Sequence, residues 1–135
     1  DLAPTFIDLA GIEVPSDIQG RSMQPVFASG GKAPEDWRTG VYYHYYEYPS
    51  WHSVKRHYGI RTSDYKLIHF YNDVDEWELY DMRRDPSEMN NVYNDPAYAK
   101  VRAELHEQLK NLQKEVGDND PDEKEYEFFS GAANL

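Results

Sequence analysis

The chain has no cysteine among its 135 residues. Disulfide bonds, thiolate metal sites and a cysteine nucleophile are therefore excluded within these residues. No apolar run approaches the ~20 residues needed to cross a bilayer, so we expect no membrane partner. No signal peptide is visible. The sequence begins Asp-Leu-Ala-Pro without an initiator methionine, and we interpret it as a fragment of a longer protein.

Positive charge is also scarce. The chain has 14 Lys and Arg residues against 25 Asp and Glu residues, a formal net charge of −11 and a pI near 4.7. Such an acidic chain is unsuited to general nucleic-acid binding, because the phosphate backbone repels it. Its length is sufficient for one domain with a real core.

Acidic residues are missing from one window of this acidic chain, between Tyr48 and Ser63. The same window contains a cluster of basic side chains: His52, Lys55, Arg56, His57 and Arg61. Cations beside aromatic residues suit an anionic, ring-bearing ligand. The alternative is a solvated loop whose cations pair with carboxylates elsewhere in the chain.

Aromatic and β-branched residues crowd the stretch from Tyr42 to Tyr80. Such residues fit a pleated, half-buried surface. The stretch predicts four consecutive strands: Tyr42–Glu47, Tyr58–Thr62, Tyr65–Tyr71 and Trp77–Met82. Ser63-Asp64 is short enough for a tight hairpin between the second and third strands. Neither face of the third strand is purely polar, so we expect both faces of the sheet to be partly covered.

Helices are predicted on both sides of the strands. The first begins at Asp1, as N-cap, and stops at Gly11; its apolar side chains cover most of its circumference, as in a helix buried in a larger body. Asp95-Pro96 opens a longer helix, which Gly117 closes after Val116. Its apolar side chains recur at spacings of three and four: Tyr98, Val101, Leu105, Leu109, Leu112 and Val116. This apolar face is expected to cover one face of the sheet.

Shorter signals mark the connections. Asp85-Pro86-Ser87-Glu88 has the spacing of a capping box and predicts one helical turn ending near Asn90-Asn91. Ala28–Glu35 contains Gly-Gly and Pro among small residues, and we expect a boundary there. Residues 118–135 begin with six acidic residues and one lysine between Asp118 and Glu127. We expect this acidic tail to be mobile, and Pro121 breaks the spacing of a calcium-binding loop.

Several short stretches follow one another in a fixed order between residue 1 and about residue 112. They are Asp1-Leu2-Ala3-Pro4-Thr5 with Leu9-Ala10-Gly11, Gln19-Gly20-Arg21-Ser22, Trp37-Arg38, Tyr58-Gly59-Ile60-Arg61-Thr62, Tyr65-Lys66-Leu67-Ile68, Trp77-Glu78-Leu79-Tyr80-Asp81, and Asp85-Pro86-Ser87-Glu88 with Asn90-Asn91. In this order and spacing they resemble the C-terminal portion of type I sulfatases, in the alkaline-phosphatase-like superfamily. Two further stretches, Tyr-Tyr-His-Tyr-Tyr-Glu at residues 42–47 and Lys-Arg-His-Tyr-Gly-Ile-Arg-Thr at residues 55–62, look most like bacterial sulfatases that act on sulfated glycans, including glycosaminoglycans.

The resemblance implies an α+β fold, with a four-stranded antiparallel sheet packed against a long C-terminal helix. Residues 1–35 would close a larger α/β catalytic domain and form a linker. Residues 36–117 would form the C-terminal subdomain, and residues 118–135 the acidic tail. The implied partners are this catalytic domain and a sulfated carbohydrate, and the implied location is periplasmic or secreted.

The resemblance also implies where the chemistry occurs. In the family, formylglycine made from the Cys or Ser of a Cys/Ser-x-Pro-x-Arg motif attacks sulfur, and a calcium ion orients the sulfate. This sequence has no such motif. The resemblance therefore places the nucleophile and the calcium in a missing part of a sulfuric ester hydrolase. No catalytic residue and no metal ligand is assigned here, and the chain alone is expected to be inactive.

In the family, this subdomain overhangs the active site and selects the glycan. The implied substrate-binding residues are His44, His52, Arg56 and His57, followed by Lys55 and Glu47. A histidine can hydrogen-bond a sugar hydroxyl when neutral and pair with a sulfate when charged, and arginine can clamp two anionic oxygens. The alternative for His44, which alternates with tyrosines in a strand, is a satisfied sheet residue. Trp51, in the loop, is a candidate for stacking on a sugar ring.

Two other functions stay open. One is a related phosphodiesterase or phosphatase of the same superfamily, and the other is a non-enzymatic glycan-binding module. The stretch Trp77–Asn91 favours a sulfatase. No pair of carboxylates requires an acid–base role, so a glycosidase has little support. For Arg61 we expect an internal ion pair, with Asp81 or Asp85.

Overall fold

The computed structural model describes residues 1–49, 51–72 and 74–118. These residues form two compact units, residues 1–38 and the residues from Thr39 onward. We expected the boundary a few residues earlier, after residue 35. The candidate binding residues all belong to the second unit.

The first unit contains two short helices, α1 (Leu2–Leu9) and α2 (Gln24–Ala28). Asp1 is the N-cap of α1, but its carboxylate makes no capping bond. It instead accepts hydrogen bonds from the backbone N–H of Arg21 and from the guanidinium of Arg38. The large apolar side chains of α1 are exposed within this unit: Leu2, Phe6 and Leu9.

The second unit is built on an antiparallel sheet with the strand order β1-β2-β3-β4. The strands are β1 (Gly40–Tyr45), β2 (His57–Thr62), β3 (Tyr65–Phe70) and β4 (Glu76–Asp81). All four predicted strands are confirmed to within two residues at each end. The predicted hairpin is confirmed as well, because only Ser63 and Asp64 separate β2 from β3.

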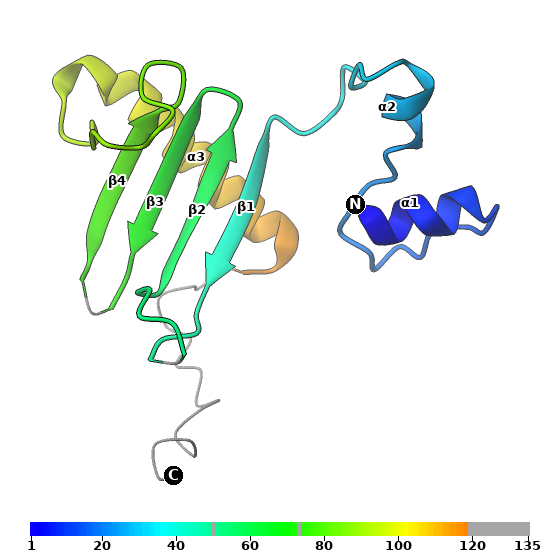
Figure 1. Ribbon diagram of the computed structural model, residues 1–135, viewed down its shortest axis with the longest axis horizontal. Coiled ribbons are helices and arrows are strands. Elements are labelled where there is room, and N and C mark those ends of the chain that lie inside the picture. The colour runs from blue at the N-terminus through cyan, green and yellow to red at the C-terminus, as the bar shows by residue number, and fades with distance from the viewer. Residues whose placement is uncertain (50, 73, 119–135) are drawn as a thin grey trace, which may run out of the picture. The chain divides into compact units, whose positions relative to one another are not determined.

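The long helix α3 (Ala99–Val116) lies across one face of this sheet (Figure 1). The one-turn 3-10 helix η1 (Pro96–Tyr98) precedes it, and the Asp95 carboxylate accepts the N–H of Ala97 at 2.9 Å. Gly117 ends α3 in the left-handed conformation, with φ 75°, which glycine adopts without strain. The predicted helix and both of its end signals are therefore confirmed.

The core lies between α3 and the sheet. Ile60, Leu67 and Leu79 are paired across β2, β3 and β4, and each is 0% exposed. Leu105 and Leu109 of α3 complete the buried cluster. Burial of each such side chain stabilises the fold by about 1.5–3 kcal/mol. This packing makes the sheet a firm support for the loops at its ends.

The helical turn predicted at Asp85–Glu88 is wrong. A capping box would need the Glu88 carboxylate to return to the N–H of Asp85. That N–H is already bonded to the carbonyl of Asp81 at 2.8 Å. The Glu88 carboxylate accepts a hydrogen bond from Lys66 Nζ at 2.6 Å instead, and Glu88 adopts a positive φ of 55°. A long-range ion pair has replaced the local capping bond.

Trp77 lies between two histidines at the edge of the core. The ring of His69 stacks on it at 4.2 Å, and the ring of His106 approaches it edge-on at 4.4 Å. His106 Nε2 also lies 3.1 Å from the hydroxyl of Tyr93. Burial, together with the positive charges of Arg102 and His69, lowers the pKa of His106.

We expect this lowered pKa to make the fold less stable in mild acid. The unfolded chain takes up the His106 proton near the ordinary pKa of 6.5, whereas the folded chain takes it up only at lower pH. The free energy of unfolding therefore falls as the pH drops below about 6.5, by at most about 1.4 kcal/mol per pH unit for one proton. Denaturant unfolding at pH 7, 6 and 5 measures this slope.

His106→Gln removes the proton-binding group and should flatten the slope. The matched control is His52→Gln, in an exposed position of the loop after β1, which should keep the wild-type slope. An equally steep pH dependence in His106→Gln and in the wild-type chain would show that His106 does not contribute to it.

Candidate functional site

The basic loop, defined here as residues 46–56, joins β1 to β2 and contains four of the six predicted site residues. They are Glu47, His52, Lys55 and Arg56, and a fifth, His57, is the first residue of β2. The backbone ties the end of the loop to the sheet, because the carbonyl of Arg56 accepts the N–H of Tyr71 at 3.3 Å. The predicted cations are thus brought to one end of the sheet.

Lys55 is held by an aromatic ring of the same loop. Its Nζ donates to the hydroxyl of Tyr48 at 2.6 Å and lies 4.0 Å from the centre of the Tyr48 ring. An ammonium over an aromatic face gains about 0.5–1 kcal/mol at an exposed site. Tyr48 was not predicted from the sequence, because its seven-residue separation from Lys55 follows no local spacing rule. The contact exists only because the loop folds back on itself.

His57 has a defined tautomer and orientation. Its Nδ1 lies 2.8 Å from the carbonyl oxygen of Lys55. A carbonyl only accepts, so Nδ1 carries the hydrogen in the neutral ring, and Nε2 is left as a hydrogen-bond acceptor. The ring stacks on Tyr45 at 5.5 Å and tilts against Phe70 at 5.1 Å. Among the described residues, none hydrogen-bonds Nε2 of His57, so this atom can take a sugar hydroxyl.

Arg56 is oriented through one of its nitrogens. Its Nε donates to the carbonyl of Tyr46 at 3.4 Å. In the described part of the chain, the two terminal nitrogens of Arg56 make no hydrogen bond, so they can face an anionic group as a pair. His52 and Trp51 lie further out on the loop, and Trp51 is 99% exposed. The loop therefore offers donors for an anion beside an aromatic ring for a sugar.

His44 is not part of this group. It pairs with Tyr58 in the register, and the adjacent residue Tyr45 pairs with His57. Adjacent strand residues point to opposite faces, so His44 lies on the face that α3 covers and His57 lies on the other. The side chain of His44 is only 8% exposed. It is therefore buried beneath the sheet.

Both ring nitrogens of His44 have partners. Nδ1 lies 2.8 Å from Oδ2 of Asp118, and Nε2 lies 2.7 Å from the hydroxyl of Tyr71. Asp118 also accepts the hydroxyl of Tyr42 at 2.5 Å, and burial together with this bond raises the pKa of Tyr42 well above its ordinary value. We call His44, Tyr42, Tyr71 and Asp118 the His44 network.

Asp118 corrects the expected start of the acidic tail. It was assigned to that tail, yet it is 8% exposed and hydrogen-bonded to β1. The left-handed turn at Gly117 directs the backbone N–H of Asp118 to the carbonyl of Gln113 at 2.8 Å, and it brings the carboxylate under the sheet. The body therefore extends to Asp118. The mobility predicted for the rest of the tail concerns residues 119–135, outside the described residues.

Arg61 does not form the internal ion pair that we expected. Asp81 lies on the helix-covered face, where it accepts the hydroxyl of Tyr98 at 3.1 Å, and Arg61 lies on the opposite face. Asp85 accepts the N–H of Asn90 instead. Nη1 of Arg61 is buried and makes no hydrogen bond with any described residue.

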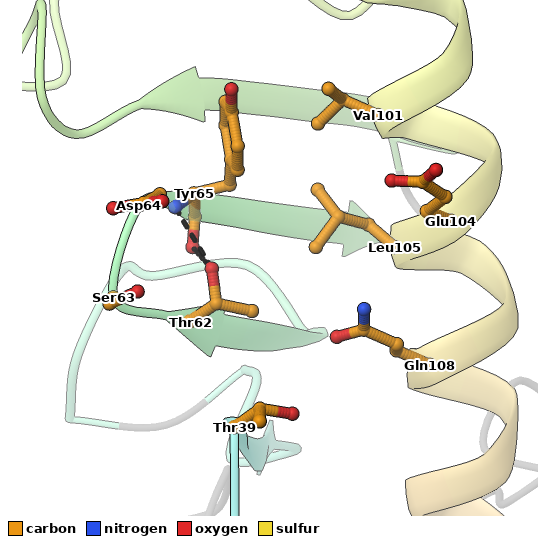
Figure 2. Close-up of a pocket in the computed structure, with 9 residues that line it drawn as sticks. All are labelled: Thr39, Thr62, Ser63, Asp64, Tyr65, Val101, Glu104, Leu105 and Gln108. Carbon is orange, nitrogen blue, oxygen red and sulfur yellow. Dashed lines mark hydrogen bonds between the residues drawn. The ribbon is translucent and has the colours of Figure 1, made fainter.

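A pocket of about 230 Å³ lies beside the β2–β3 hairpin (Figure 2). This hairpin joins the strand ends opposite the basic loop. It is lined by the β2–β3 hairpin, by Thr39 and by one side of α3. The hydroxyl of Thr62 accepts the N–H of Tyr65 at its rim. Two carboxylates, Asp64 and Glu104, line this pocket, so it does not suit an anionic ligand.

No group of three or more metal-binding side chains is placed to hold an ion within the described ranges. In the same ranges, the helices are all too short or too polar to cross a membrane. The arrangement thus supports binding of an anionic, ring-bearing ligand at the basic loop.

Comparison with known proteins adds to this geometry. A family model described as "N-sulphoglucosamine sulphohydrolase, C-terminal" matches residues 1–115. The chain is 63% identical over 135 residues to an N-acetylglucosamine-6-O-sulfatase of Bacteroides thetaiotaomicron, covering 100% of this chain and 24% of that protein. It is 38% identical over 109 residues to a Delta 4,5-hexuronate-2-O-sulfatase of the same organism, covering 77% of this chain and 21% of the relative.

A solved structure shares this fold. It is a protein in complex with its substrate, D-glucosamine-2-N,6-O-disulfate, and it is 66% identical to this chain with a TM-score of 0.90. The match covers 93% of this chain and 25% of that protein. The chain thus spans about a quarter of the length of each of these two proteins, the N-acetylglucosamine-6-O-sulfatase and the solved structure.

Proposed function

Because this chain belongs to the family of N-sulphoglucosamine sulphohydrolase C-terminal regions, we propose that it is the substrate-selecting part of a longer sulfatase. The longer protein would hydrolyse sulfate esters of glycans. The observation that carries this proposal is the basic loop. The chain has a net charge of −11, yet most of this loop lies in a window without Asp or Glu and contains several cations. The loop also contains the fully exposed Trp51. Arg56 and His57 have hydrogen-bonding atoms that no described residue engages.

The proposed substrate is a 6-O-sulfated glucosamine. Two similar proteins are described by such a substrate, one in its name and one in its bound ligand. Nε2 of His57 would accept a sugar hydroxyl. Arg56 and His52 would pair with an anionic group of the glycan, and Trp51 would stack on a sugar ring. Lys55 and Glu47 would border the site.

For His44 we propose a positioning role instead of direct contact with the glycan. Nε2 of His44 lies within hydrogen-bonding distance of the Tyr71 hydroxyl. The backbone N–H of Tyr71 in turn donates to the carbonyl of Arg56. The His44 network therefore reaches the end of the basic loop through a single residue. A substitution at His44 would disturb the loop through Tyr71.

The catalytic domain is the proposed partner of this chain, and it would supply the formylglycine and the calcium ion implied by the resemblance. We assign no ligand of that ion to this chain, because no metal-binding cluster lies within its described residues. A periplasmic or secreted location is proposed from the resemblance to bacterial glycan sulfatases.

The proposed division of labour is tested by comparing residues 1–135 with the longer protein on an aryl sulfate in the presence of calcium. We expect turnover by the longer protein and none by this chain, because the chain cannot supply a formylglycine. Turnover by the chain that survives repurification and follows the protein through a column would overturn the proposal.

The same preparations separate the two alternatives. A phosphodiesterase or phosphatase predicts that the longer protein prefers phosphate esters to sulfate esters. A non-enzymatic binding module predicts that residues 1–135 alone bind sulfated glucosamine measurably. We expect weak or no binding by the chain alone, because half of the pocket would be absent.

A further inference from the structure

The face of the sheet opposite α3, here called the outer face, has two buried polar atoms without a partner. They are the hydroxyl of Tyr43 and Nη1 of Arg61, and neither makes a hydrogen bond with any described residue. Buried polar groups in folded proteins are nearly always hydrogen-bonded, and a buried cation needs an opposite charge. Two adjacent exceptions therefore require an explanation.

The position of Tyr43 follows from the glycine that faces it. Tyr43 pairs with Gly59 across β1 and β2. A Cβ on Gly59 would lie 2.7 Å from the Tyr43 hydroxyl and 2.3 Å from the carbonyl oxygen of Leu67. The missing side chain thus lets the phenol lie directly on the sheet. Burial and the nearby carboxylates of Glu88 and Glu78 raise the pKa of Tyr43, so its hydroxyl remains a donor.

The carboxylates near these donors already have partners. Oε2 of Glu88 accepts Lys66 Nζ at 2.6 Å, and Oε2 of Glu78 accepts the hydroxyl of Tyr80 at 3.0 Å. Within the described residues, Nη1 of Arg61 and the hydroxyl of Tyr43 are therefore two donors without an acceptor on this face.

The sugar bound at the basic loop is too far along the strand to be the acceptor for Arg61, although the ring of Tyr43 lies 6.0 Å from that of His57. Arg61 lies four residues beyond His57 along β2. At about 3.3 Å per residue, this separation is roughly 13 Å, toward the opposite end of the strand. The family model covers Tyr43 and Arg61 but ends at residue 115, before the acidic tail. These two donors therefore lie in the region shared by proteins about four times as long.

We propose that the outer face is the surface on which the catalytic part of the same polypeptide docks, with a carboxylate of that part seated on Arg61 and Tyr43. This inference rests on the proposed function, because it requires the longer protein. A carboxylate fits best, since it accepts two hydrogen bonds and neutralises the partly buried guanidinium of Arg61.

The test is the melting temperature of Arg61→Met, measured in the longer protein and in residues 1–135 alone. In the longer protein we expect a loss of roughly 5 °C or more, because a buried charge pair is broken. In the chain alone we expect no loss, or a small gain, because the substitution removes a buried donor that has no partner there. The same substitution is thus expected to lower the melting temperature of the longer protein and not that of residues 1–135 alone.

Tyr43→Phe is the second variant, because it keeps the ring over Gly59 and removes only the hydroxyl. It should show the same pattern with a smaller loss. Arg83→Met is the control, since Arg83 is exposed and lies 3.7 Å from its carboxylate partner, Asp64. It should shift neither melting temperature by more than about 1 °C.

Equal losses in both contexts would overturn the proposal by placing the acceptor within residues 1–135. Deleting residues 119–135 from the chain would then show whether the acidic tail provides it. No loss in either context would also overturn the proposal, and would mean that water satisfies both donors. Sulfatase activity of the wild-type longer protein is scored separately, so failure of the proposed function is distinguishable from failure of the docking surface.

Discussion

Replacing Arg56 with alanine in the longer protein is expected to lower kcat/KM for 6-O-sulfated glucosamine about ten- to hundredfold. A lost hydrogen bond to a charged group costs about 1.5–3 kcal/mol, which corresponds to this loss. A small aryl sulfate should be nearly unaffected, because it lacks the sugar that the basic loop binds. Remote contacts also position the substrate, so part of the loss is expected in kcat. Steady-state kinetics on both substrates measure the difference.

Two further variants sharpen this test. His57→Phe should show the same selective loss, because it keeps a ring against Tyr45 and Phe70 and removes the acceptor at Nε2. Arg84→Ala is the control, since Arg84 is an exposed arginine beyond the end of β4, away from the basic loop. Its loss should leave kcat/KM unchanged for both substrates. Equal losses on both substrates would indicate misfolding or a direct role in the chemical step. An unchanged kcat/KM for the saccharide would mean that the basic loop is a solvated surface that does not bind the substrate.

Replacing His44 with alanine is expected to lower the free energy of unfolding by roughly 2–4 kcal/mol. The change leaves the buried carboxylate of Asp118 and the hydroxyl of Tyr71 without their ring partner. Asp118→Ala should cost a similar amount. The double variant should cost less than the sum, because the two residues belong to one network. Denaturant unfolding of residues 1–135 measures all three.

His52→Ala is the matched control, because it removes an exposed histidine and should cost less than about 0.5 kcal/mol. If His44→Ala unfolds like the wild-type chain but abolishes saccharide turnover in the longer protein, His44 contacts the glycan directly. That result would restore the role first predicted from the sequence and reject the positioning role.

The fold was largely predictable because its strongest signals are local. Aromatic and β-branched runs marked the four strands, a two-residue gap marked the hairpin, and Asp95 and Gly117 marked the ends of the long helix. Asp85–Glu88 was misread because a local signal competed with a distant partner. Lys66, 22 residues from Glu88, takes the carboxylate that a capping box would use. No pattern near residue 88 reveals that competition.

The position of the candidate residues was predictable only in part, and their binding role stays a prediction. The absence of acidic residues between Tyr48 and Ser63 correctly indicated one loop with several cations. The grouping of His44 with His57 was not decidable, because a long loop between two strands leaves their register open, and a shift of one residue exchanges the faces. Asp118 was assigned to the tail on composition. Its contact with His44 spans 74 residues and depends on the turn at Gly117.

The most direct test of the account is the structure of the longer protein with its nucleophile inactivated and 6-O-sulfated glucosamine bound. We expect Arg56 and Nε2 of His57 within hydrogen-bonding distance of the saccharide, about 3.2 Å or less. We also expect no residue of this chain in contact with the reacting sulfur. A saccharide that does not touch the basic loop, or a side chain of this chain at the reacting sulfur, would contradict the central claim that this region selects the substrate and leaves the chemistry to the catalytic domain.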